Sequence, residues 1–131
     1  MTDILSTRAA DNIRLGASRT IITPAAATYN LIRLPRYAFV TDVWLKVNTV
    51  GSSKTVSVGW AGNGETAVTT GFLSVDIADV TVAGLKRAMK DTLVSFEGKY
   101  FSDAGGMITM TVGTAQTTGN FTVFVQYHII H

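Results

Sequence analysis

The chain has 131 residues, no cysteine and a formal net charge of +2, which together favour one domain and exclude disulfides and thiolate metal sites. Charged residues make up 15% of the chain, well below the roughly one quarter typical of soluble domains. The net charge is too small to indicate nucleic acid as a partner. No apolar run is long enough to span a membrane, and the first residues do not have the pattern of a signal peptide. We interpret the shortage of charge as a sign that other proteins cover part of the surface.

Residues 1–18 show no clean periodicity, and we expect an extended N-terminal arm before a β domain over residues 19–131. Residues 1–36 carry five arginines against two aspartates, a balance of +3. This is either an ordinary solvated segment or an arm whose guanidinium groups pair with carboxylates of a neighbouring subunit. On the second interpretation, the interface residues of the arm are Arg8, Arg14 and Arg19.

Alternation of apolar and polar residues predicts strands in the first half of the chain. The expected strands cover residues 19–23, 29–34, 38–50 and 54–60. In the third of these, one parity carries Phe39, Val43, Leu45 and Val47, which we expect to face the core. The turn at residues 51–53 predicts that the third and fourth strands form a hairpin.

The second half begins with a long polar loop at residues 61–71 and a strand at 72–77. Residues 80–91 are ambiguous between a short helix and an irregular segment, and short strands are expected at 93–96 and 99–101. The strongest alternation covers residues 107–112 and 121–129, which we expect to pair as a second hairpin. This succession of short strands predicts an all-β fold, an antiparallel β-sandwich of jelly-roll type.

Large apolar side chains also fall on parities that should face water. Trp44 lies among Asp42, Lys46 and Asn48, while Phe124 and Ile130 lie among Thr122, Gln126 and His128. In a chain so poor in charge, we interpret Trp44, Phe124 and Ile130 as contact residues for other subunits. The alternative is chance exposure, or cover by a loop of the same chain.

Residues suited to catalysis or metal binding are few. The two histidines, His128 and His131, have neither metal spacing nor a Gly-x-Ser-x-Gly nucleophile motif to accompany them. Asp76 and Asp79 do not form an ordered calcium loop, and the glycines at 59, 62 and 64 lack the spacing of a phosphate loop. We therefore expect no enzyme activity, no metal and no cofactor.

Several stretches resemble small structural proteins of tailed bacteriophages. They are residues 39–47, 56–60 with the following Gly/Asn loop, 98–101, 105–106, 108–112 and 121–128. The resemblance is one of style and spacing over residues 19–131. It implies a β-sandwich virion protein, either a capsid decoration (cement) protein, usually trimeric, or a head–tail or tail component.

The expected function is that of a virion structural protein. It would be assembled in the host cytoplasm, form a homo-oligomer, with a trimer favoured, and bind the outside of a capsid through the major capsid protein or another virion protein. One alternative is a tail, neck or fibre component. Another is a carbohydrate-binding module that uses Trp60 beside its polar loop.

Overall fold

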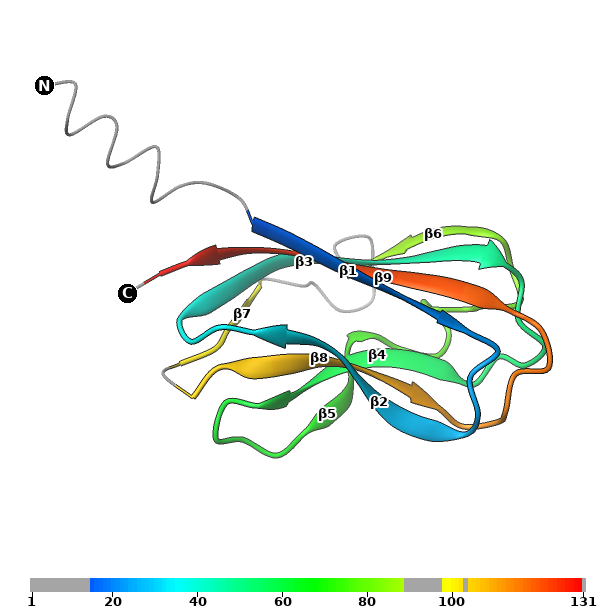
Figure 1. The fold of residues 1–131 in the computed structure, drawn as a ribbon, viewed down its shortest axis with the longest axis horizontal. Helices are drawn as coiled ribbons and strands as arrows, with labels where there is room; N and C mark the ends of the chain where they lie inside the picture. The colour runs from blue at the N-terminus through cyan, green and yellow to red at the C-terminus, as the bar shows by residue number, and fades with distance from the viewer. Residues whose placement is uncertain (1–14, 89–97, 103, 131) are drawn as a thin grey trace, which may run out of the picture.

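The computed structural model describes residues 15–88, 98–102 and 104–130, which form two antiparallel sheets packed face to face (Figure 1). One sheet has the order β1-β9-β3-β6, with β7 also paired to β3, and the other has the order β2-β8-β4-β5. The strands are β1 (Leu15–Ile22), β2 (Ala27–Leu34), β3 (Ala38–Thr49), β4 (Val56–Gly62), β5 (Val68–Leu73), β6 (Gly84–Arg87), β7 (Lys99–Tyr100), β8 (Gly106–Val112) and β9 (Asn120–Ile129).

The pairing of the strands is nested. When the two-residue β7 is set aside, β1 pairs with β9, β2 with β8, β3 with β6 and β4 with β5. This wrapping of one half of the chain around the other is the topology of a jelly roll. The predicted all-β sandwich of jelly-roll type is therefore confirmed.

The core lies between the two sheets and is built from residues of one parity on each strand. Val43 and Leu45 of β3 are fully buried, as are Ile108 and Met110 of β8. Phe121, Val123 and Val125 of β9 are also buried, and Tyr127 and Ile129 of the same parity are partly buried against the core. The strong alternation at residues 107–112 and 121–129 thus predicted correctly which side chains form the core.

Both predicted hairpins are wrong. β3 pairs with β9, β6 and β7 but not with β4, and β8 pairs with β2 and β4 but not with β9. The loops at residues 50–55 and 113–119 instead carry the chain from one sheet to the other. Side-chain alternation gives the buried face of a strand, and two strands of facing sheets bury their faces just as two strands of one hairpin do. Alternation therefore could not decide between the two arrangements.

The predicted inward position of Phe39 is also wrong. The register between β3 and β9 shifts between Val40 and Asp42, so that Thr41 is the extra residue of a β-bulge. The bulge reverses the parity of the first residues of β3. Val40 is consequently buried in the core, and Phe39 lies on the outer face opposite His128 and Tyr100.

Other boundaries differ from the sequence-based expectation. Within the ambiguous segment at residues 80–91, residues 84–87 form β6, a short edge strand that pairs with β3, and residues 89–91 lie outside the described residues. β5 begins at Val68, within the expected loop, and ends at Leu73. The strand expected at residues 93–96 lies outside the described residues. No helix among the described residues has the length and apolar character needed to cross a membrane.

β1 begins at Leu15, before the strand expected at residues 19–23. Its first residues pair with β9 in unbroken register, from Leu15 opposite Tyr127 to Ile22 opposite Asn120. Backbone pairing to β9 therefore fixes this part of the chain despite its weak side-chain periodicity. Arg8 and Arg14 lie outside the described residues.

Candidate functional site

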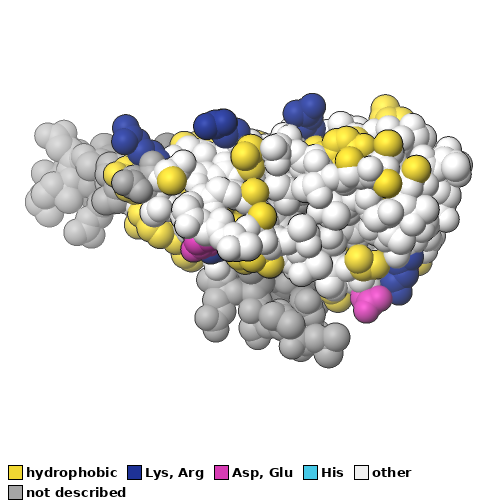
Figure 2. Space-filling model, turned by 90° about the horizontal axis from the view of Figure 1, so that it is seen from below, with side chains coloured by type: hydrophobic (Ala, Val, Ile, Leu, Met, Phe, Trp, Pro, Cys, Tyr) yellow, Lys and Arg dark blue, Asp and Glu magenta, His cyan; other side chains and the backbone are white. Residues whose placement is uncertain are grey.

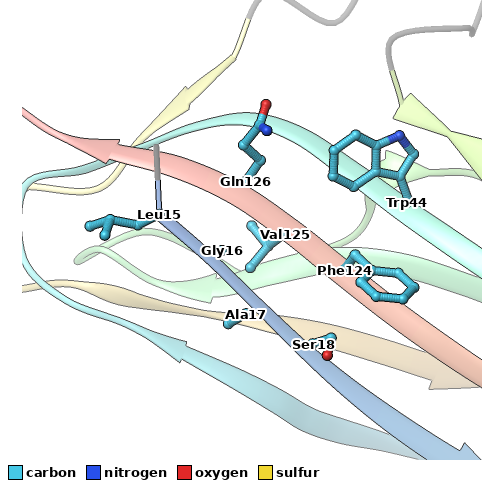
Figure 3. Close-up of a pocket in the computed structure, with 8 residues that line it drawn as sticks. All are labelled: Leu15, Gly16, Ala17, Ser18, Trp44, Phe124, Val125 and Gln126. Atoms are coloured by element: carbon cyan, nitrogen blue, oxygen red, sulfur yellow. The ribbon is translucent and has the colours of Figure 1, made fainter. Parts of the chain in front are cut away.

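The outer face of the β1-β9-β3-β6 sheet carries a row of four residues that are register partners across the strands. Ser18 of β1 lies opposite Phe124 of β9, which lies opposite Trp44 of β3, and Trp44 lies opposite Arg87 of β6. Directly opposed side chains on one face of a sheet lie about 5 Å apart at their Cβ atoms. The structure thus brings Trp44 and Phe124 together as the sequence suggested, with both rings partly exposed (Figure 3).

Two open hollows flank this aromatic pair. One, of about 430 Å³, lies towards β6 and is lined by Trp44, Phe124, Lys46, Val47, Gly84 and Leu85. The other, of about 330 Å³, lies towards β1 and includes Leu15 and Gln126 in its lining (Figure 3). Leu85 is 55% exposed, so the apolar surface continues from the aromatic pair to the edge of the sheet. We call Trp44, Phe124 and Leu85 the aromatic patch.

Trp44 contacts the arginine of an ion pair between Arg87 and Asp42. The guanidinium of Arg87 lies 5.3 Å from the centre of the Trp44 ring, within the range of a cation–π contact. The same guanidinium donates two hydrogen bonds to Oδ2 of Asp42, from Nη2 at 2.6 Å and Nε at 3.2 Å. Asp42 is buried although it lies on the outer face. Arg87 therefore covers the carboxylate and positions the indole at the same time.

Ile130, the third predicted contact residue, lies apart from the aromatic patch. It is 49% exposed and follows β9, six residues beyond Phe124, which corresponds to about 20 Å along an extended strand. Two tyrosines lie beside it: the hydroxyl of Tyr100 donates a hydrogen bond to the Ile130 carbonyl at 3.3 Å, and the Ile130 amide donates one to the Tyr37 carbonyl at 2.8 Å. Ile130 thus belongs to a separate apolar corner of the molecule.

Arg19, predicted to act in the arm, lies within β1. Its Nη1 is 3.5 Å from the carbonyl oxygen of Leu31 in β2, so that the side chain reaches across the open side of the sandwich. The sequence periodicity could not indicate this contact, because β1 and β2 belong to different sheets. Periodicity within a strand does not show which strand of the facing sheet lies beside it.

Trp60, considered as a sugar platform, is enclosed by its own chain. The ammonium of Lys99 lies 4.4 Å from the centre of its ring, and Phe72 packs edge-on with the ring centres 5.2 Å apart. A Cβ at Gly71 would collide with the six-membered ring of the indole, so the backbone of β5 also lies against it. These contacts occupy the surfaces of Trp60 that a sugar would need.

The titratable groups with altered pKa values form exposed pairs and not a converging site. A hydrogen bond from Lys99 lowers the pKa of Glu65, and one from Thr81 lowers the pKa of Asp79. A hydrogen bond to Asp76 raises the pKa of Lys54. Among the described residues, no three His, Asp or Glu side chains lie close enough together to hold a metal ion.

The second sheet presents a different outer face. Figure 2 shows it from outside, covered mostly by uncharged polar side chains and backbone, with charged groups at its margins. Threonines of neighbouring strands bond to one another there, for example Thr28 of β2 and Thr111 of β8 with their Oγ1 atoms 3.1 Å apart. The aromatic patch is thus confined to one of the two faces.

No protein-family model and no curated protein matches this chain. Phage capsid structures are among the solved structures that share its fold. A chain of the acidic stable capsid of Helicobacter pylori bacteriophage KHP30 is 21% identical, with a TM-score of 0.60 over 90% of this chain and 89% of that chain. A chain of the cyanophage Pam1 capsid asymmetric unit is 18% identical, with a TM-score of 0.63 over 89% and 85%.

The third structure is the capsid of Ralstonia phage GP4, with a chain 13% identical and a TM-score of 0.62 over 92% of this chain and 87% of that chain. In each case the likeness extends over most of both chains. At these identities it establishes the fold and leaves the role of each residue open. The predicted resemblance to phage structural proteins is therefore confirmed for the fold: this chain is a jelly roll of the kind found in phage capsid structures.

Proposed function

We propose that this chain is a virion structural protein that forms a homo-oligomer and binds the outer surface of a phage capsid as a decoration protein. The observation that carries the proposal is the shared fold with chains of three phage capsid structures, each matched over at least 85% of its length. The low share of charged residues supports a protein whose surface is covered in its working state.

The aromatic patch is the surface proposed for contact between copies. Tryptophan and arginine are enriched among the residues that dominate interface energies, and here Arg87 already fixes the Trp44 ring. A side chain held in place before binding loses less conformational entropy on binding. A closed ring of subunits, such as a trimer, would bury one such patch in each subunit against the next.

Attachment to a capsid also suits a small protein with modest individual contacts. Because an oligomer presents several copies of each contact to a repeating shell, the second and third contacts form at high effective concentration. Proposed attachment residues are Ile130 at its separate corner and the arginines at positions 8, 14 and 19. The partner is the major capsid protein or another virion protein.

The test has two readouts, subunit association and binding to particles that lack this protein. Wild-type protein is expected to sediment as an oligomer and to pellet with the particles at a fixed number of copies. The double variant Trp44→Ser, Phe124→Ser is expected to sediment as a monomer and to bind particles less tightly. Val68→Ser, which removes an exposed apolar side chain (38%) from β5 of the other sheet, serves as the control and should resemble wild type.

A wild-type protein that remains monomeric and fails to pellet with particles would overturn the proposal. Copy counting separates a decoration protein from a tail, neck or fibre component, since a tail or neck ring contains few copies per particle. The carbohydrate alternative is weakened by the contacts that enclose Trp60. Binding to glycans that Trp60→Ala abolishes would restore it.

A further inference from the structure

The open margin of the sandwich formed by β1 and β2 is basic. Arg19 of β1, Arg33 of β2 and Arg36 just after β2 are all exposed, and residues 15–36 include no Asp or Glu. In Figure 2, Lys and Arg side chains follow one another along the upper margin, which is the side of β1 and β2, without acidic side chains beside them. We call these three arginines the basic margin.

The acidic side chains of the described residues are engaged elsewhere. There are four of them, and three form ion pairs: Asp42 with Arg87, Glu65 with Lys99 and Asp76 with Lys54. The fourth, Asp79, accepts hydrogen bonds from Thr81. Within the described part of the chain, the basic margin therefore has no carboxylate partner.

The same margin offers backbone groups for pairing. Among the described strands, β1 has one neighbour, β9, and its register with β9 runs from Leu15 to Ile22 without a bulge. A regular edge strand exposes a row of N–H and C=O groups to which another strand can add. β2 is a poorer acceptor, because its register with β8 shifts between Asn30 and Ile32.

Arg19 affects which kinds of strand can pair with the β1 edge. Its register partner Val123 is buried, so the Arg19 side chain starts from the inward parity and leaves the sandwich at the margin, where it meets the Leu31 carbonyl. Charged residues of inward parity discourage unwanted pairing of edge strands. A second copy of β1 added here would bring arginines together, whereas a strand with Asp or Glu would find partners for them.

We propose that the β1 edge binds an extended acidic segment of a partner protein, which adds as a strand and pairs its carboxylates with Arg19, Arg33 and Arg36. The inference deepens the proposed function, on which it rests, by giving the chemistry of the virion partner. Arginine suits this role because its planar guanidinium bonds carboxylates at two points. A basic margin could also attract the phosphates of DNA, and that occupant is an outcome of the test.

The first experiment uses soluble probes and the full chain. One probe is a ten-residue peptide of alternating Val and Glu, the second is the same peptide with Gln in place of Glu, and the third is a DNA duplex. Backbone amide NMR shifts are followed at matched ionic strength. The Val/Glu peptide is expected to shift the amides of Leu15–Ile22, while the Val/Gln peptide causes smaller shifts and added salt reduces the effect.

Shifts confined to other strands, equal shifts with both peptides, or binding of the DNA without the acidic peptide would each overturn the inference. The double variant Arg33→Gln, Arg36→Gln should weaken peptide binding by about fivefold or more, from the loss of two surface charge pairs. The control Lys54→Gln, Lys86→Gln removes the same charge away from the margin and should bind like wild type.

The second experiment repeats particle binding with the same two double variants. If wild type binds particles and the arginine double variant binds equally well, the inference fails and the decoration role stands. If wild type does not bind particles at all, the proposed function fails, while the peptide result still reports whether the β1 edge accepts an acidic strand. The two failures are thus distinguishable.

Discussion

Arg87 of β6 neutralises the buried carboxylate of Asp42 on β3, with Nη2 of the arginine 2.6 Å from Oδ2 of the aspartate. The Asp42 side chain is 2% exposed and that of Arg87 is 34% exposed, so the pair lies at the boundary between the sheet and solvent. Oδ1 of Asp42 accepts a further hydrogen bond from the Val43 amide at 2.9 Å. The pair therefore links the short edge strand to the longest strand of the sheet.

Replacing Asp42 with Ala should destabilise the protein by about 2–3 kcal/mol. The value is below the 3–5 kcal/mol typical of a fully buried pair because Arg87 keeps contact with water. Urea unfolding measures it. Asp76→Ala is the control, since its carboxylate is 84% exposed and solvent screens its pair with Lys54, so that its removal should cost much less stability. Equal losses in the two variants would contradict this account.

Gly59 allows β5 to lie directly against β4. A Cβ at this position would collide with the carbonyl oxygen of Val68, and a backbone atom cannot move aside as the end of a flexible side chain can. Gly59→Ala is expected to lower the free energy of unfolding by about 1–3 kcal/mol. Gly16→Ala in β1 is the matched control, because its Cβ would meet Val125 O at an ordinary 3.6 Å. A thermal melt of both variants would reveal the difference.

Gln116 joins the two loops that cross between the sheets. Its Oε1 accepts hydrogen bonds from the amides of Ser52 and Ser53 at 2.9 and 3.1 Å, and its Nε2 donates to the carbonyls of Ser53 and Thr114 at 2.9 and 3.2 Å. Gln116 is also buried.

Gln116→Ala should therefore cost about 2 kcal/mol, since it leaves backbone groups without their partner. Thr117→Ala should be nearly neutral, because the exposed Thr117 bonds Ser52 through its backbone amide, which alanine retains. Hydrogen exchange should show faster exchange of the Ser52 and Ser53 amides in the first variant alone. Unchanged protection would exclude the proposed link.

Glu65 should make stability depend on acid pH. The hydrogen bond from Lys99, with Nζ 2.7 Å from Oε2, lowers the pKa of Glu65 below its ordinary value of 4.5. The unfolded chain therefore binds more protons at this residue than the folded one, so the stabilisation is complete above pH 4.5 and is lost as the pH falls through the folded pKa. Chemical unfolding of wild type and Glu65→Gln should give curves that converge in acid; a constant gap would refute the linkage.

The sequence predicted those strands that can be recognised from the alternation of their own residues. In the first six residues of β9 burial alternates residue by residue, because the period of two follows from the strand itself, whereas in β8 the outward Thr109 is buried together with Ile108 and Met110. It also placed Trp44 and Phe124 on an outer face. β6 was missed because Val82 and Leu85 have helical spacing, whereas the segment is an edge strand with Leu85 exposed to solvent.

Relationships between distant residues could not be predicted in this way. The Asp42–Arg87 pair joins positions 45 apart, and Arg87 falls in a segment whose residues do not alternate as in a strand. The bulge at Thr41 depends on pairing with β9, so its effect on Phe39 was equally hidden. The basic margin could not be predicted either, because its arginines come together only when β1 and β2 lie on the same side of the sandwich.

The nested strand order has a consequence for biosynthesis. Thr20 of β1 bonds Thr122 of β9, which is 102 residues later in the chain, so β1 cannot pair until β9 has left the ribosome. Contacts between such distant segments slow folding, because a long loop must close before any pairing is gained. β1 and β2 therefore stay without their strand partners until β9 and β8 have been synthesised, and the arrival of β9 closes the sheet and ends that vulnerable period.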